Sequence, residues 1–120
     1  MNTTSPIARF PQAHKLPLRV RNRLIGEVVD ALQTSNAAVE KAIRILFERQ
    51  THAERQANAT LENNGLGVRH NHAHRVAYYG RWVTSGRKLT GWHLDRAREL
   101  AMTYSRTQLM ELAALKAGLI

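Results

Sequence analysis

Residues 68–75, VRHNHAHR, place His70, His72 and His74 at alternate positions between two arginines. In a strand all three imidazoles would share one face, whereas in a helix only His70 and His74, four residues apart, would do so. Two histidines at that spacing can hold Zn or Ni, but a stable site needs a third and fourth ligand, and the flanking arginines repel a cation. We therefore expect no metal site here.

A helix boundary is the better interpretation of this stretch. We expect Asn71 or His72 to cap a helix that starts there, and the remaining histidines to extend a basic surface. Their positive charge would grow as the pH falls below about 6.5.

Catalytic patterns are weak in this chain. Glu27 and Asp30 share a helical face, as do Asp95 and Glu99, but neither pair has a neighbouring histidine or glycine-rich motif that would assign acid and base roles. The glycines of the segment 65–67 do not follow a strand, so they are no dinucleotide fingerprint. We expect a protein that is not an enzyme and that carries no cofactor.

Positive charge and aromatic residues are concentrated together. The chain has 18 Lys and Arg against 9 Asp and Glu, a formal net charge of +9, which favours polyanionic partners and argues against mimicry of DNA. Residues 65–106 hold a local charge of +6 and five of the seven aromatic residues, interleaved as HRVAYYGRWVTSGRKLTGWH. Basic groups neutralise phosphates, and exposed rings stack on bases, so this segment suits a nucleic-acid surface.

The candidate binding residues follow from that segment. The expected phosphate-neutralising residues are Arg69, His74, Arg75, Arg81, Arg87, Lys88 and Arg96, and the possible stacking residues are Tyr78 and Trp82. Tyr78 shares a helical face with His74 and Arg81, which makes it the better stacking residue. The alternative is that Tyr79, Tyr104 and at least one tryptophan are core anchors, since aromatic side chains dominate the burial of apolar area in small domains.

The elements that must position these residues are helices. All three prolines lie within residues 1–17, which read as an irregular arm, and the rest of the chain has apolar residues at helical spacing. The pattern predicts helices over about 18–33, 36–63, 71 or 72–85, and 91–117, the last with a possible kink near 105–107. We expect an all-α fold, with residues 18–120 forming a single helical domain of about four helices whose most basic part is 65–106.

Capping residues and apolar stripes refine these helices. Thr34, Ser35 and Asn36 offer an N-cap for the second helix, Thr90 offers one for the last, and Gly86 should end the third. The inner faces are predicted to carry Leu18, Ile25, Val28, Val29 and Leu32, then Val39, Ile43, Leu46 and Phe47, then Val76, Tyr79, Gly80 and Val83, and finally Leu94, Ala97, Ala101, Tyr104, Leu112 and Leu115.

The cellular setting is inferred from what the sequence lacks. It has no cysteine, its first residues form no apolar signal core, and its apolar runs are shorter than the ~20 residues that span a bilayer. We expect a cytoplasmic protein without a membrane partner.

The stretches NNGLGVRHNHA, SGRKLTGWHLDRAREL and TYSRTQL together resemble a short module of phage and mobile-element proteins, in some of which it stands beside helicase-like or other DNA-processing domains. The resemblance covers roughly residues 63–113. The positions that carry it are Asn64, Gly65, Gly67, Gly86, Arg87, Leu89, Thr90, Ala97, Arg98, Tyr104, Gln108 and Leu109. Val68 and His72 stand where that module usually has an aromatic and an acidic residue. The resemblance implies a phage or prophage origin, and hence the cytoplasm of a host cell, and a nucleic-acid setting.

Three functional hypotheses remain open. The first is a nucleic-acid-associated protein that binds mainly the phosphate backbone. The second is a phage-encoded inhibitor, similar in role to an anti-CRISPR protein, that binds a host ribonucleoprotein or protein effector. The third is a helical homo-oligomer whose interface is the small-residue stripe Ala53, Ala57 and Leu61.

Overall fold

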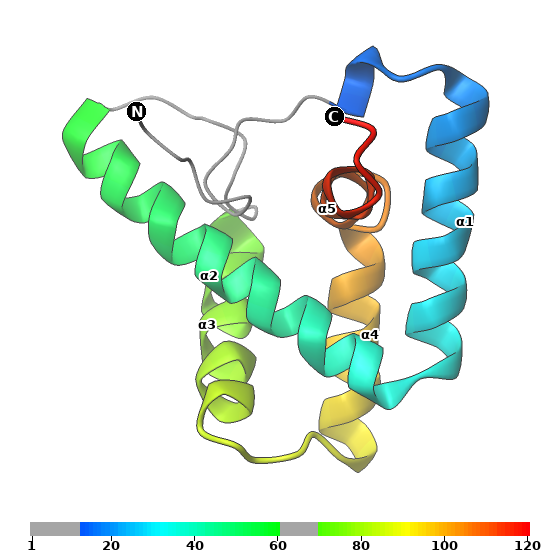
Figure 1. The fold of residues 1–120 in the computed structure, drawn as a ribbon. Coiled ribbons are helices and arrows are strands. Elements are labelled where there is room, and N and C mark those ends of the chain that lie inside the picture. Colours follow the sequence, from blue (N-terminus) through cyan, green and yellow to red (C-terminus); the bar gives the residue numbers. More distant parts are fainter. Residues whose placement is uncertain (1–12, 61–69) are drawn as a thin grey trace.

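The computed structural model describes residues 13–60 and 70–120, with side chains for 13–51 and 72–120. These residues form one 3-10 helix and five α-helices and contain no strand, which confirms the all-α fold (Figure 1). The elements are η2 (Ala13–Lys15), α1 (Leu18–Thr34), α2 (Asn36–Thr60), α3 (His70–Thr84), α4 (Gly91–Thr103) and α5 (Gln108–Lys116). Among the described helices, none is long and apolar enough to cross a membrane.

Helix α2 is the central element of the bundle. It crosses α3 and α4 on one side, and α1 lies alongside α4 and α5 (Figure 1). The main core forms where α2, α3 and α4 meet, and every residue of the stripe predicted for α3 is buried. Its buried members are Leu32, Val39, Ala42, Ile43, Leu46, Val76, Tyr79, Val83, Leu89, Ala97, Leu100, Ala101, Tyr104 and Leu109.

A second, smaller core joins η2, α1 and α5. It consists of Ala13, Leu24, Met110 and Ala114. The stripe predicted for the first helix is wrong at Leu18, which is 62% exposed, and it lacked Leu24, which is buried against η2 and α5. Part of the arm expected to be irregular therefore packs as a 3-10 helix, while residues 1–12 lie outside the described residues.

Local sequence signals set several helix ends. The Ser35 hydroxyl accepts a hydrogen bond from the Ala38 amide at 3.1 Å, so the predicted N-cap of α2 is confirmed. Helix α3 ends at Thr84 and is terminated, as predicted, by Gly86, whose φ of +89° suits glycine. The amides of Gly86 and Arg87 donate to the carbonyls of Val83 and Trp82 at 3.1 and 3.3 Å, which is a Schellman motif.

The predicted last helix is two helices, so the described residues hold five α-helices where about four were expected. Helix α4 ends at Thr103, where the amides of Tyr104 and Ser105 donate to carbonyls only three residues back, and α5 begins at Gln108. Thr107 has φ −121° and ψ −95°, outside the helical region. The kink expected near 105–107 is therefore a complete break in the helix.

A buried ion pair ties α2 to α5. Nη2 of Arg49 lies 2.7 Å from Oε1 of Glu111, with exposed side-chain fractions of 0% and 3%. Nη1 of Arg49 also donates to the Gln108 carbonyl at 3.4 Å. This pair fixes the position of α5 against the middle of α2.

Candidate nucleic-acid interface

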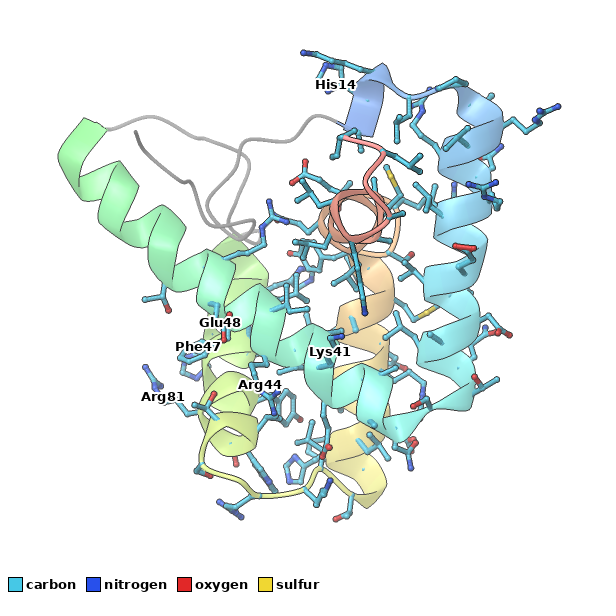
Figure 2. All side chains as sticks on the ribbon, viewed as in Figure 1. His14, Lys41, Arg44, Phe47, Glu48 and Arg81 are labelled. Atoms are coloured by element: carbon cyan, nitrogen blue, oxygen red, sulfur yellow. The ribbon has the colours of Figure 1, made fainter. Side chains whose placement is uncertain are left out.

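The predicted binding residues that the structure describes lie on α3, on the loop 85–90 and on the first turns of α4. We call this region the α3–α4 surface and define it by His74, Arg75, Tyr78, Arg81, Trp82, Arg87, Lys88, Trp92 and Arg96. All are exposed except Trp82 and Arg96, which are half-buried. Arg81 projects outward from α3 (Figure 2). Arg69 lies outside the described residues.

Four aromatic rings surround His93 within this surface. The ring centroid of His93 lies 4.8 Å from Trp82 and from Trp92, 5.7 Å from Tyr79 and 6.3 Å from Tyr78. The Tyr79 hydroxyl and Nδ1 of His93 share a hydrogen bond of 3.1 Å. His93 is therefore the residue that joins α4 to the rings of α3, and sequence reasoning missed it because only the packing of α3 against α4 brings it there.

Two guanidinium groups lie over the two tryptophan rings. Cζ of Arg87 lies 4.2 Å from the Trp82 ring centroid, and Cζ of Arg96 lies 4.7 Å from that of Trp92. Stacking on a ring occupies the flat face of a guanidinium and leaves its N–H donors at the edge, where they can bind phosphate oxygens. On this surface each of the two tryptophan rings is thus paired with an arginine.

The loop 85–90 is held by specific hydrogen bonds. Nε1 of Trp82 donates to the Lys88 carbonyl at 3.1 Å, and the Leu89 amide donates to Oε2 of Glu40 in α2 at 2.8 Å. Glu40 also lies 3.7 Å from Nζ of Lys88, whose side chain nevertheless remains 81% exposed. The loop that carries Arg87 and Lys88 is therefore anchored to α3 and to α2, and its charges still face solvent.

Burial of the Tyr79 side chain raises its pKa above the ordinary value, while the nearby charges of Arg96 and Arg75 oppose part of this rise. Tyr79 is thus a core anchor, and so is Tyr104, as the alternative interpretation of the aromatic residues expected. Trp82 packs against the same core, whereas Trp92 is 61% exposed.

The histidines differ from the prediction in one respect. Helix α3 begins at His70, so Asn71 and His72 both lie inside the helix and neither caps it. Nδ1 of His72 instead lies 2.8 Å from the Tyr104 hydroxyl, and the two rings meet edge to face. His74 is exposed, as a surface residue should be. Within the described part of the chain, no three histidine or acidic residues lie close enough together to hold a metal ion.

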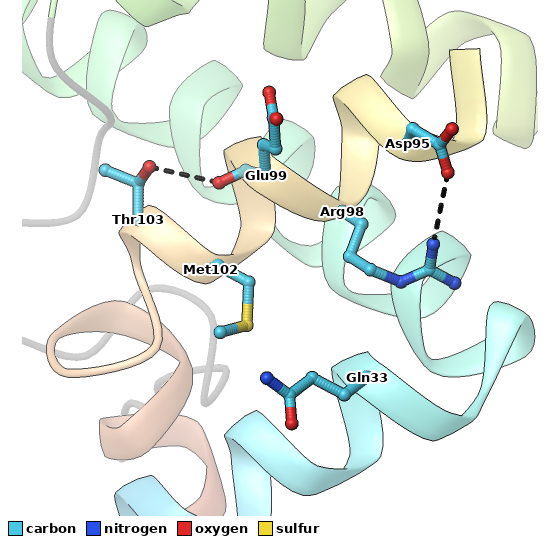
Figure 3. A pocket seen from close by; sticks show the side chains of 6 residues that line it. All are labelled: Gln33, Asp95, Arg98, Glu99, Met102 and Thr103. Atoms are coloured by element: carbon cyan, nitrogen blue, oxygen red, sulfur yellow. Dashed lines mark hydrogen bonds and ion pairs between the residues drawn. The ribbon is translucent and has the colours of Figure 1, made fainter. Parts of the chain in front are cut away.

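A shallow depression between α1 and α4 contains the acidic pair of α4. It is lined by Gln33, Asp95, Arg98, Glu99, Met102 and Thr103 (Figure 3). Arg98 lies 3.5 Å from Asp95, and it also donates to the Leu32 carbonyl at 2.9 Å and to Oδ1 of Asn36 at 2.7 Å. Arg98 therefore joins α4 to the junction of α1 and α2, so its charge is largely engaged within the fold.

Comparison of the chain with protein-family models, with curated proteins and with solved structures finds no match.

Proposed function

We propose that this protein binds nucleic acid through the α3–α4 surface, mainly by contacts with the phosphate backbone. The observation that carries the proposal is the pairing of cations with aromatic rings on one surface, Arg87 with Trp82 and Arg96 with Trp92. Glu40 lies beside Lys88 and accepts the Leu89 amide, and Asp95 lies beside Arg98. Each of these two carboxylates thus has a cation beside it, which offsets part of its repulsion of a phosphate.

The proposed partner follows from the residue types. Arginine and lysine neutralise phosphates, and the release of condensed counterions then drives binding that weakens as salt is added. The cations available for this are Arg75, Arg81, Arg87, Lys88 and Arg96, together with the exposed side chain of His74. No catalytic step is part of the proposal.

A salt series tests the proposal. Binding of labelled single-stranded and duplex oligonucleotides would be followed by fluorescence anisotropy at increasing salt concentration. Replacing Arg87 or Arg81 by alanine should weaken binding and lower the slope of log K against log salt by about 1 in magnitude. Arg23→Ala is the matched control, because Arg23 is also exposed but lies on α1. Binding that is absent at low salt, or indifferent to salt, would refute the proposal.

A second candidate function is inhibition of a host effector, and the exposure of Trp92 favours it. Tryptophan and arginine are enriched among the hot spots of protein interfaces, and Arg96 lies over the exposed Trp92. In this alternative, a phage-encoded protein in the cytoplasm of a bacterial host would bind a protein or ribonucleoprotein effector, as an anti-CRISPR protein does. Capture from host lysate with and without nuclease separates the two functions, because only a direct protein partner survives nuclease treatment.

The third hypothesis, a homo-oligomer, rests on the stripe Ala53, Ala57 and Leu61, which falls outside the described side chains. Light scattering in solution tests it, and a purely monomeric mass would exclude it.

A further inference from the structure

We propose that the α3–α4 surface takes single-stranded nucleic acid, with bases stacking on the exposed rings of Trp92 and Tyr78. This inference rests on the proposed function and adds the class of nucleic acid and the residues that select it. It assigns the main stacking role to Trp92, which sequence reasoning did not single out.

Trp92 has the exposure that a stacking platform needs. It is the second residue of α4, and its side chain is 61% exposed although it is among the largest apolar groups of the chain. Its contacts cover only part of the ring: His93 meets it at 72° and Arg96 lies over one face, yet the residue keeps most of its surface exposed. The ring is therefore already oriented before a base stacks on it. The Arg96 guanidinium lies close enough to neutralise the phosphate of the same nucleotide or the next.

Tyr78 supplies a second ring nearby. It is 50% exposed and meets Trp82 and Tyr79 at steep angles, with centroid distances of 5.8 and 5.3 Å. Tyr78 and Trp92 both contact His93, at 6.3 and 4.8 Å, so the two exposed rings are no farther apart than the sum of these distances. Nucleotides close together on one strand can reach both rings.

Trp82 has a supporting role in this arrangement. Its indole N–H is bonded to the Lys88 carbonyl, Arg87 covers its ring at 4.2 Å, and the side chain packs against the core. We therefore assign it to holding the loop 85–90 and the Tyr78 ring rather than to stacking on a base.

The exposed rings favour a single strand over a duplex. In a duplex each base is stacked between its neighbours, so its flat face is not available to a protein side chain, and binding through phosphates gains nothing from exposed rings. In a single strand every base can offer its face, and such stacking is tolerant of sequence. A surface that combines free aromatic area with cations is thus matched to unpaired nucleotides.

The first experiment compares single-stranded and duplex oligonucleotides at one salt concentration, with DNA and RNA versions of the same strand. We expect the intact protein to prefer the single strand. Trp92→Ala and Tyr78→Ala should each weaken single-strand binding by about fivefold or more, while duplex binding changes by less than about twofold. Trp92→Phe and Tyr78→Phe should keep most of the affinity because they keep a ring. Leu18→Ala is the control, since Leu18 is 62% exposed but lies on α1.

A second measurement observes the stacking directly. The chain contains two tryptophans, so Trp82→Phe leaves Trp92 as the single tryptophan fluorophore. A single-stranded oligonucleotide should quench this fluorescence, and a duplex at equal occupancy should quench it much less.

The outcomes separate this inference from the function on which it rests. If neither strand form binds, the proposed function fails together with the inference. If both forms bind alike and the ring variants weaken both equally, the function stands and the single-strand inference is overturned. The inference is also overturned if Trp92→Ala leaves oligonucleotide binding intact but abolishes nuclease-resistant capture of a host protein, which would make Trp92 a protein-binding residue.

Discussion

Replacing Gly80 of α3 by alanine should destabilise the protein, because Phe47 of α2 packs directly against this glycine. A Cβ atom on Gly80 would lie 2.5 Å from Cβ and 2.8 Å from Cδ1 of Phe47 in α2, and it would be closer still to Cγ. Cβ of Phe47 moves only with the backbone of α2, so no side-chain rotation can relieve that contact. The two helices would have to move apart, and together they form the largest helix–helix contact of the fold.

The magnitude follows from two opposing effects. Alanine in a helix interior is favoured over glycine by about 1 kcal/mol. Overpacking of a core costs about 1–3 kcal/mol, and we take the upper end because the clash reaches the backbone-fixed Cβ of Phe47. Gly80→Ala should therefore lower the free energy of unfolding by about 2 kcal/mol and the Tm by about 8 °C.

Chemical and thermal denaturation followed by circular dichroism would measure this change. Gly26→Ala is the matched control, because Gly26 is a helical glycine of α1 with no atom within 4 Å of an added Cβ, and it should be neutral or stabilising. In a Phe47→Ala background the penalty at Gly80 should shrink but persist, since alanine retains Cβ. If Gly80→Ala is as harmless as Gly26→Ala, the close approach of α2 and α3 is wrong.

Two further predictions concern buried polar groups. Glu111→Gln should lower the free energy of unfolding, measured by urea denaturation, by about 3–5 kcal/mol, because the fully buried Arg49 would lose its carboxylate partner. The double change of Arg49→Met with Glu111→Leu should recover most of that loss. Equal instability of the single and double variants would contradict the ion-pair explanation. Because the pKa of Tyr79 is raised in the folded protein, the unfolded chain loses this proton at a lower pH than the folded chain does. The contribution of Tyr79 to the free energy of unfolding should therefore be fully present below about pH 10 and decrease above it. The free energy of unfolding of Tyr79→Phe should decrease less steeply over the same range. Parallel slopes for the two proteins would refute that assignment.

Sequence reasoning succeeded where the signal is local. The N-cap at Ser35 and the end of α3 at Gly86 depend on side-chain and backbone bonds within a few residues, so their signatures can be recognised in the sequence. The buried stripe of α3 was also predicted correctly, because one apolar face at helical spacing suffices to define it.

The remainder depends on contacts between distant segments. Nothing near Arg49 marks it as buried, because its partner Glu111 lies 62 residues away on α5. The same holds for His72, whose expected capping role gave way to a contact with Tyr104 that only the docking of α3 near the end of α4 creates. His93 likewise became a centre of the candidate site only through packing of α4 against α3.

Side chains of the core also hold the residues of the α3–α4 surface in place. Tyr79 is buried in the core and bonded to His93, and His93 contacts Trp92; Trp82 packs on the core and is bonded to the Lys88 carbonyl. The exposed rings and cations are thus held by side chains that the fold already fixes, so little further ordering of these side chains is needed on binding. Substitution of His93 should accordingly weaken binding through misplacement of Trp92, even though His93 itself is only half-buried beneath the rings.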